Sequence, residues 1–254
     1  MADVAAPFTI RAGLLGWWRD SLRHRGLWRT LGGFVHGWYE LLRDLTPARR
    51  RLRFGDLDYD FEQHVDTTWA NLRWRTRVRE LLAGRQYQPT DPGLFREVIG
   101  ALGIEYSRFT FLDLGSGKGR ALLLACEFPF RRIIGVELLP ELHRIAQQNI
   151  RQFRDGAEQA RISLYRDDAR QFRFPPEPLT VFLFDPFPDY ILEEVLANLH
   201  HSWQAHPRDL LIVYQNPISE HVLSNAAWLR RLRGNIQYAV YEAAPGPAAH
   251  YPVT

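Results

Sequence analysis

The stretch FTFLDLGSGKGR, residues 109–120, decides the fold of this chain of 254 residues. Its first half is an apolar run that ends in Asp113, and its second half carries Gly115, Gly117 and Gly119. Such a run is typical of a buried parallel strand, and such glycines are typical of a tight turn that opens a helix whose first amides face a ligand. The sequence therefore predicts a strand, a ligand-binding glycine loop and a helix in succession.

The spacing of the glycines separates this loop from two common nucleotide-binding loops. A dinucleotide-binding loop, Gly-x-Gly-x-x-Gly, would need a glycine at the position of Arg120. A phosphate-binding P-loop would need Ser or Thr directly after Lys118, where Gly119 stands. Both of these loop types are excluded.

Strand-like and helix-like segments alternate after the loop, as they do in a doubly wound α/β sheet. Further strands are predicted at residues 132–137, 162–165, 179–184, 210–214 and 236–242, and helices at 120–127, 140–153 and 190–203. Acidic residues stand at the ends of several strands, namely Glu137, Asp167, Asp168 and Asp185. Because open α/β sheets bind ligands at the carboxyl edge of their strands, we expect these acids to lie around one site.

These motifs resemble those of the class I S-adenosylmethionine-dependent methyltransferases over about residues 85–245. The likeness is closest to bacterial methyltransferase-like proteins of unassigned substrate, which share the Gly-Ser-Gly-Lys-Gly-Arg loop and an Asn/Asp-Pro-Phe corner. A looser likeness is to the non-SET protein lysine methyltransferases of the telomeric-silencing type, which share the Asp-Leu-Gly-Ser-Gly loop and a Gly-Val-Glu second strand. The resemblance implies a Rossmann-like doubly wound α/β sheet, with S-adenosylmethionine as the cofactor.

The resemblance also assigns roles to the residues around the loop. The glycines and Asp113 would hold the methionine part of the cofactor, and Glu137 would accept hydrogen bonds from both ribose hydroxyls. Asp168 would meet the adenine amino group, with Asp167 as the alternative. The complete set of predicted cofactor-binding residues is Tyr87, Thr90, Asp113, Gly115, Ser116, Gly117, Gly119, Glu137, Leu138, Asp168, Ala169 and Phe184.

The corner Phe184-Asp185-Pro186-Phe187 is the predicted catalytic segment. It resembles the Asp/Asn-Pro-Pro-aromatic signature of amino-methylating nucleic-acid enzymes, but Phe187 replaces the second proline and Pro188 replaces the aromatic residue, which disfavours adenine as the acceptor. Asp185 and Phe187 are the predicted catalytic residues, because an acid accepts hydrogen bonds from an amine and an aromatic ring packs against a cationic sulfonium. Alternatively, Asp185 is only the N-cap of a strand-to-helix turn.

Residues 1–85 are predicted to be a helical extension, followed by a methyltransferase domain at 86–254. Residues 11–53 carry ten arginines against three acids. An amphipathic helix is predicted there from apolar residues at spacings of three and four, namely Leu27, Leu31, Phe34, Trp38, Leu41 and Leu45. This region either packs as a cap over the catalytic domain or binds a membrane surface or an acidic partner.

Two shorter segments connect the extension to the glycine loop. Residues 49–60 are charged and turn-prone, and are predicted to be a linker. Asp91 and Pro92 have the pattern of an N-cap and first helical residue, and so begin a predicted helix that ends at Gly103. We expect Tyr87 and Thr90, just before this helix, to fold over the cofactor.

Composition limits the remaining possibilities. The net charge of +3 is too small to require a nucleic-acid partner, and the single Cys126 excludes an internal disulfide. The clustered histidines 200, 201 and 206 lack the pairing of a metal site, so no metal is predicted. We expect a cytoplasmic protein, with attachment to a membrane through residues 11–53 as the second option.

The predicted function is methyl transfer from S-adenosylmethionine to a nitrogen or oxygen nucleophile. A protein side chain and a small molecule are both open as acceptors, and nucleic acid is less favoured. The alternative is a non-catalytic module that binds S-adenosylmethionine and is tethered by the basic N-terminal helices.

Overall fold

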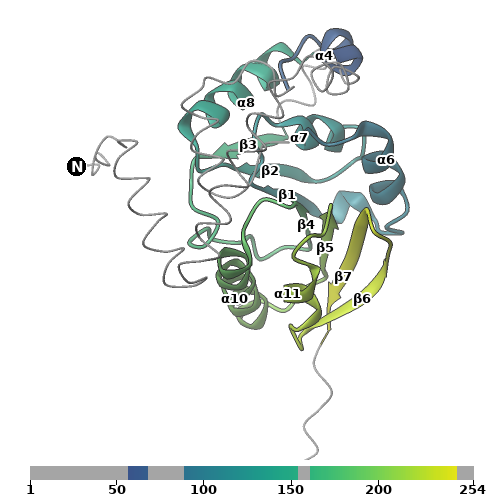
Figure 1. Ribbon diagram of the computed structural model, residues 1–254, viewed down its shortest axis with the longest axis vertical. Coiled ribbons are helices and arrows are strands. Elements are labelled where there is room, and N and C mark those ends of the chain that lie inside the picture. The colour runs from purple at the N-terminus through teal and green to yellow at the C-terminus, as the bar shows by residue number, and fades with distance from the viewer. Residues whose placement is uncertain (1–56, 68–88, 154–160, 245–254) are drawn as a thin grey trace, which may run out of the picture. The chain divides into compact units, whose positions relative to one another are not determined.

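The computed structural model describes residues 57–67, 89–153 and 161–244 (Figure 1). The predicted site residue Tyr87 and the amphipathic region 11–53 lie outside these ranges. The boundary expected at residue 85 therefore stays a prediction.

A single mixed sheet organises the described residues. Its strands are β1 (Thr110–Leu114), β2 (Arg132–Val136), β3 (Ile162–Tyr165), β4 (Leu179–Phe184), β5 (Leu210–Gln215), β6 (Leu229–Gly234) and β7 (Tyr238–Ala243). They lie in the order β3-β2-β1-β4-β5-β7-β6. The first five strands are parallel, whereas β7 is antiparallel to both of its neighbours. The strand order reverses between β1 and β4, which is where doubly wound sheets bind their ligands. The predicted Rossmann-like α/β fold is confirmed.

Helices cover both faces of this sheet (Figure 1). On one face lie α4 (Leu57–Gln63), α6 (Pro92–Gly100), α7 (Arg120–Ala125) and α8 (Pro140–Gln152), and on the other lie α10 (Asp189–Ala205) and α11 (Glu220–Ser224). A short 3-10 helix, η3 (Tyr106–Arg108), precedes β1. Asp91 caps α6 by accepting a hydrogen bond from Leu94 N at 2.7 Å, as predicted.

The strands contribute side chains to two hydrophobic cores, one on each face of the sheet, because successive side chains of a strand point to opposite faces. Phe111 and Phe182 pack with α6 and α7, where the rings of Phe95, Phe111 and Phe182 meet at centroid distances of 5.3 to 5.8 Å. Leu112 and Leu183 pack with α10 on the other side. The alternation explains why β1 and β4 are continuous apolar runs, since both of their faces are covered.

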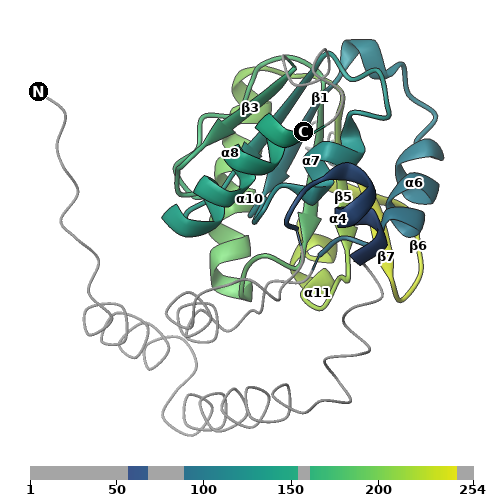
Figure 2. The same cartoon turned by 90° about the horizontal axis from the view of Figure 1, so that it is seen from above.

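Residues 59–67 belong to the same compact unit as the sheet. The prediction of a linker over 49–60 is wrong at its end, because Leu57–Gln63 form α4, which lies beside α7 (Figures 1 and 2). Strand β6 was also not expected. Its sequence, LRRLRG, lacks an apolar run because β6 is the edge strand and much of it is exposed to solvent.

Candidate functional site

The glycine loop turns tightly around the end of β2. Gly115, Gly117 and Gly119 have φ values of 81°, 54° and 88°, which L side chains rarely adopt. The amides of Gly115 and Ser116 both donate to Val136 O, at 2.9 and 3.0 Å, and Gly119 N donates to Ser116 O at 2.8 Å. The loop's own backbone and that of β2 therefore both contribute to its shape.

The corner after β4 packs directly against this loop. A Cβ atom on Gly115 would lie 2.6 Å from Pro186 Cβ, which is too close for any side chain. Asp185, which precedes this proline, has a φ of 42°, an uncommon value for a residue other than glycine. The predicted catalytic corner and the predicted cofactor loop thus meet at the switch point of the sheet.

Glu137 joins the end of β2 to the loop. Its Oε2 accepts a hydrogen bond from Gly117 N at 2.9 Å and its Oε1 accepts one from Leu139 N at 2.7 Å. Burial raises the pKa of Glu137, and the backbone amides of Leu139, Gly117 and Leu138 oppose this rise. The side chain of Leu138 is 60% exposed beside this buried acid.

Asp113 is a second buried carboxylate at the same edge, at the end of β1. It is 4% exposed, and no other described residue forms a hydrogen bond with its side chain. Burial raises the pKa of Asp113 well above its ordinary value, and the charge of Glu137 raises it further. Because a buried carboxylate pair is unfavourable without a counter-charge, these two acids favour a cationic ligand.

Asp168 and Asp167 follow β3 in different environments. The Asp168 carboxylate accepts hydrogen bonds from Arg170 N, Nε and Nη2, and each of its oxygens receives two of them. Burial raises the pKa of Asp168, but the hydrogen bonds and charge of Arg170 outweigh it and lower the pKa. Asp167 is exposed, and its Oδ1 accepts Asp168 N at 2.8 Å. The choice between these two acids stays open, and Ala169, next in the chain, is buried in the core.

Asp185 is held by a tyrosine that the sequence analysis did not single out. Tyr214, on β5, is fully buried and donates its hydroxyl to Asp185 Oδ1 at 2.9 Å, while Ser219 N donates to the same hydroxyl at 3.2 Å. The N-cap of α10 is Pro188, so the alternative role of Asp185 as a helix cap is wrong.

The two aromatic residues of the corner are both half-buried. Phe184 packs against the core that contains α6 and α7. Phe187 packs against the core on the α10 side of the sheet.

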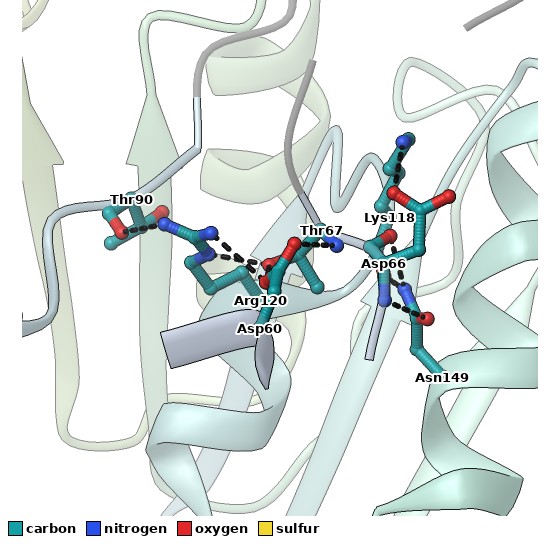
Figure 3. Close-up of polar contacts among 7 residues, drawn as sticks. All are labelled: Asp60, Asp66, Thr67, Thr90, Lys118, Arg120 and Asn149. Atoms are coloured by element: carbon teal, nitrogen blue, oxygen red, sulfur yellow. Dashed lines mark hydrogen bonds and ion pairs between the residues drawn. The ribbon is translucent and has the colours of Figure 1, made fainter. Parts of the chain in front are cut away.

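Two buried cations lie within the glycine loop itself. Lys118 pairs with Asp66 and Arg120 pairs with Asp60, both from the segment 59–67 (Figure 3). Thr90 is 5% exposed, and its carbonyl oxygen accepts a hydrogen bond from Arg120 Nη1 at 3.4 Å. The sequence analysis missed these pairs because nothing local to either partner indicates them.

The described part of the chain contains neither a cluster of metal ligands nor a membrane-spanning helix. Within residues 57–67, 89–153 and 161–244, no group of three or more His, Cys, Asp or Glu side chains is placed to hold a metal ion. No helix in those same ranges is both long and apolar enough to cross a membrane.

Comparison with known proteins finds similarity only at the level of structure. No protein-family profile and no curated protein matches the chain. The glycopeptide N-methyltransferase MtfA is 9% identical with a TM-score of 0.48, covering 64% of this chain and 93% of its own. The methyltransferase domain of bacterial CtHen1 is 16% identical with a TM-score of 0.46, covering 61% and 100% of the two chains.

An RNA methyltransferase from Salinibacter ruber, solved with S-adenosyl-L-homocysteine, is 15% identical with a TM-score of 0.45, covering 66% of this chain and 100% of its own. The three similarities cover between 61% and 66% of this chain.

Proposed function

We propose that this chain is an S-adenosylmethionine-dependent methyltransferase that acts on a nitrogen or oxygen nucleophile of a protein side chain or a small molecule. One observation carries the proposal. Asp113 and Glu137 are buried at the ends of adjacent parallel strands, beside a glycine loop at the switch point of the sheet.

The residues at this edge fit S-adenosylmethionine chemically. The ligand has a cationic ammonium group, a cationic sulfonium and a ribose with two hydroxyls. Asp113 supplies a carboxylate with no hydrogen bond from any other described residue, and Glu137 supplies two acceptor oxygens. The glycines leave the backbone of the loop without side chains, so a ligand can approach it closely.

Asp185 has the position and chemistry to prepare the acceptor. S-adenosylmethionine, when bound, would supply a methyl group on a sulfonium; a neutral nucleophile would attack this methyl carbon in line with the carbon–sulfur bond, which would break to release S-adenosylhomocysteine. The carboxylate of Asp185, held by Tyr214, would accept a hydrogen bond from the acceptor and take its proton. The departure of residues 184–188 from the adenine-methylating signature favours a protein or small-molecule acceptor.

Calorimetry tests the cofactor first. The wild-type protein is titrated with S-adenosylmethionine, S-adenosylhomocysteine and NAD, and the first two are expected to bind. Preference for NAD, or no binding by either sulfur ligand, would overturn the proposal.

Turnover is tested next, with methyl-labelled cofactor and cell extract separated into protein, nucleic acid and small molecules. Label is expected in the protein or small-molecule fraction. Binding without any transfer would instead support the non-catalytic module. The cytoplasm is the proposed location, and fractionation of cells tests it.

A further inference from the structure

The glycine loop contains two cations that solvent does not reach. Lys118 is 0% exposed and Arg120 is 2% exposed. A buried charge is strongly unfavourable unless an opposite charge and hydrogen bonds accompany it. Both cations find those partners in residues 59–67, where each acid precedes its cation by more than fifty positions.

Arg120 is enclosed by three parts of the chain (Figure 3). Its Nη2 lies 3.1 Å from Asp60 Oδ1, its Nε donates to Thr67 Oγ1 at 2.6 Å, and its Nη1 reaches Thr90 O. Its Cζ also lies 5.2 Å from the centre of the Tyr59 ring. Asp60 Oδ2 in turn accepts Thr67 N at 2.7 Å, which closes the network.

Lys118 is held by a second set of contacts in the same segment. Its Nζ lies 2.8 Å from Asp66 Oδ1. Asn149, on α8, bonds to both backbone groups of Asp66 at 2.8 Å and also donates to Lys118 O at 2.9 Å. The segment is thus attached to the backbone of the loop as well as to its side chains.

The same loop also contacts the buried acid Glu137. Gly117 N donates to Glu137 Oε2 at 2.9 Å, and Gly117 is the immediate neighbour of Lys118. A continuous chain of contacts therefore runs from Asp66 through Lys118 and Gly117 to Glu137. Such contiguous networks are a physical route by which two sites can influence each other.

We propose that docking of residues 59–67 on Lys118 and Arg120 is thermodynamically coupled to occupation of the cofactor site. Lys118 and Arg120 are then positioning residues, which hold the loop in the shape that receives the cofactor. The proposal rests on the function proposed above. Coupling is reciprocal, so the cofactor must strengthen docking by the factor by which docking strengthens cofactor binding.

The composition of the chain supplies a direct probe of docking. Lys118 is its only lysine. The rate at which an N-hydroxysuccinimide ester acetylates Lys118 therefore reports the fraction of molecules in which residues 59–67 have left the loop. The α-amino group is acetylated as well, and peptide mass spectrometry distinguishes the two acetylated sites. Full-length wild-type protein is labelled with and without saturating S-adenosylhomocysteine. The ligand is expected to slow labelling by roughly five- to a hundredfold, the usual range of coupling between sites.

Asp60→Asn tests the reverse direction. Asp60 pairs with Arg120, so this variant weakens docking without removing the partner of Lys118. Faster labelling of Lys118 and weaker binding of S-adenosylhomocysteine are expected, and the loss of affinity should approach the wild-type protection factor as docking is lost. The control is Glu242→Gln, which breaks the Arg230–Glu242 pair between β6 and β7 with an equal change of charge and should alter neither quantity.

The outcomes separate the two proposals. Calorimetric binding of S-adenosylhomocysteine with an unchanged labelling rate of wild-type Lys118 overturns the coupling alone, and this result needs no variant that folds. Slower labelling in the wild type, together with wild-type affinity in an Asp60→Asn protein whose Lys118 is labelled as fast as an unprotected amine, means direct shielding of the lysine and also overturns the coupling. If the wild-type protein binds neither S-adenosylmethionine nor its product, the proposed function fails and the coupling fails with it.

Discussion

Replacement of Asp113 by asparagine should raise stability and lower cofactor affinity at the same time. Asp113 is buried, and no other described residue stabilises its carboxylate by a hydrogen bond. Asparagine has nearly the same shape and carries no charge. The substitution therefore removes an unfavourable buried charge from the ligand-free protein without opening a cavity.

The sign of the stability effect follows from the pKa. Burial, with the charge of Glu137 as a smaller cause, raises the pKa of Asp113 above the ordinary value of 3.8. The folded protein therefore binds this proton more tightly than the unfolded chain does. Below pH 3.8 Asp113 is protonated in both the folded and the unfolded protein, so the full stability of the folded state is present. As pH rises through the folded-state pKa, the buried acid ionises and this part of the free energy of unfolding is lost. The Asp113→Asn protein has no such acid to ionise. The difference in the free energy of unfolding between this variant and the wild type should therefore grow from acid toward neutral pH.

The affinity effect has the opposite sign. A hydrogen bond between a carboxylate and a cationic ligand group contributes about 1.5–3 kcal/mol, so its loss should weaken binding of S-adenosylmethionine by roughly ten- to a hundredfold. Binding lets the wild-type carboxylate gain a counter-charge, whereas the asparagine gains none.

Thermal unfolding across pH and calorimetric titration measure the two effects on one pair of proteins. Asp209→Asn is the matched control, because it removes an exposed acid just before β5, at the opposite edge of the sheet from the ligand site. The electrostatic origin of the effect would be refuted if the Asp113→Asn protein were less stable than the wild type at neutral pH. It would also be refuted if the stability gained by the substitution increased toward acid pH. Wild-type affinity in this variant would remove Asp113 from the ligand site.

Four further perturbations test other parts of the structure. Gly115→Ala should destabilise the protein by more than the about 1–2 kcal/mol that a left-handed backbone costs, because the added Cβ meets Pro186. In thermal unfolding, Gly103→Ala should show the backbone contribution alone, since φ is 68° there and nothing lies within 4 Å of the added Cβ. Asp185→Asn should lower turnover while the calorimetric Kd for S-adenosylmethionine stays at the wild-type value, and equal turnover would exclude a catalytic role. A chain that begins at residue 55 should fold and bind the cofactor with reduced activity on the natural acceptor; loss of cofactor binding in a folded protein would contradict this division of roles. If residues 11–53 bind membranes, the full-length protein should float with anionic liposomes at low salt and be released as salt rises, whereas absence from the liposomes at every salt concentration would favour a packed cap.

Local sequence patterns were sufficient for the elements around the loop. The run that ends in Asp113, the glycine spacing and the helix from Arg120 were all predictable, because strand burial, positive φ and helix initiation depend on neighbouring residues. The same holds for the α6 cap at Asp91, which needs only the residues of one helical turn. Edge strand β6 was not predictable from periodicity, since solvent replaces one of its neighbours.

The sequence by itself determined the α/β sheet, the glycine loop and the acids at the ends of the strands. Tertiary structure alone decided that Asp113 and Glu137 are both buried, that Tyr214 holds Asp185, and that Asp60 and Asp66 neutralise Arg120 and Lys118. The reason is physical. A buried charge selects its partner by distance in space after the chain has packed, and the residues that meet here are separated by 29 to 60 positions in sequence, beyond the range of any local pattern.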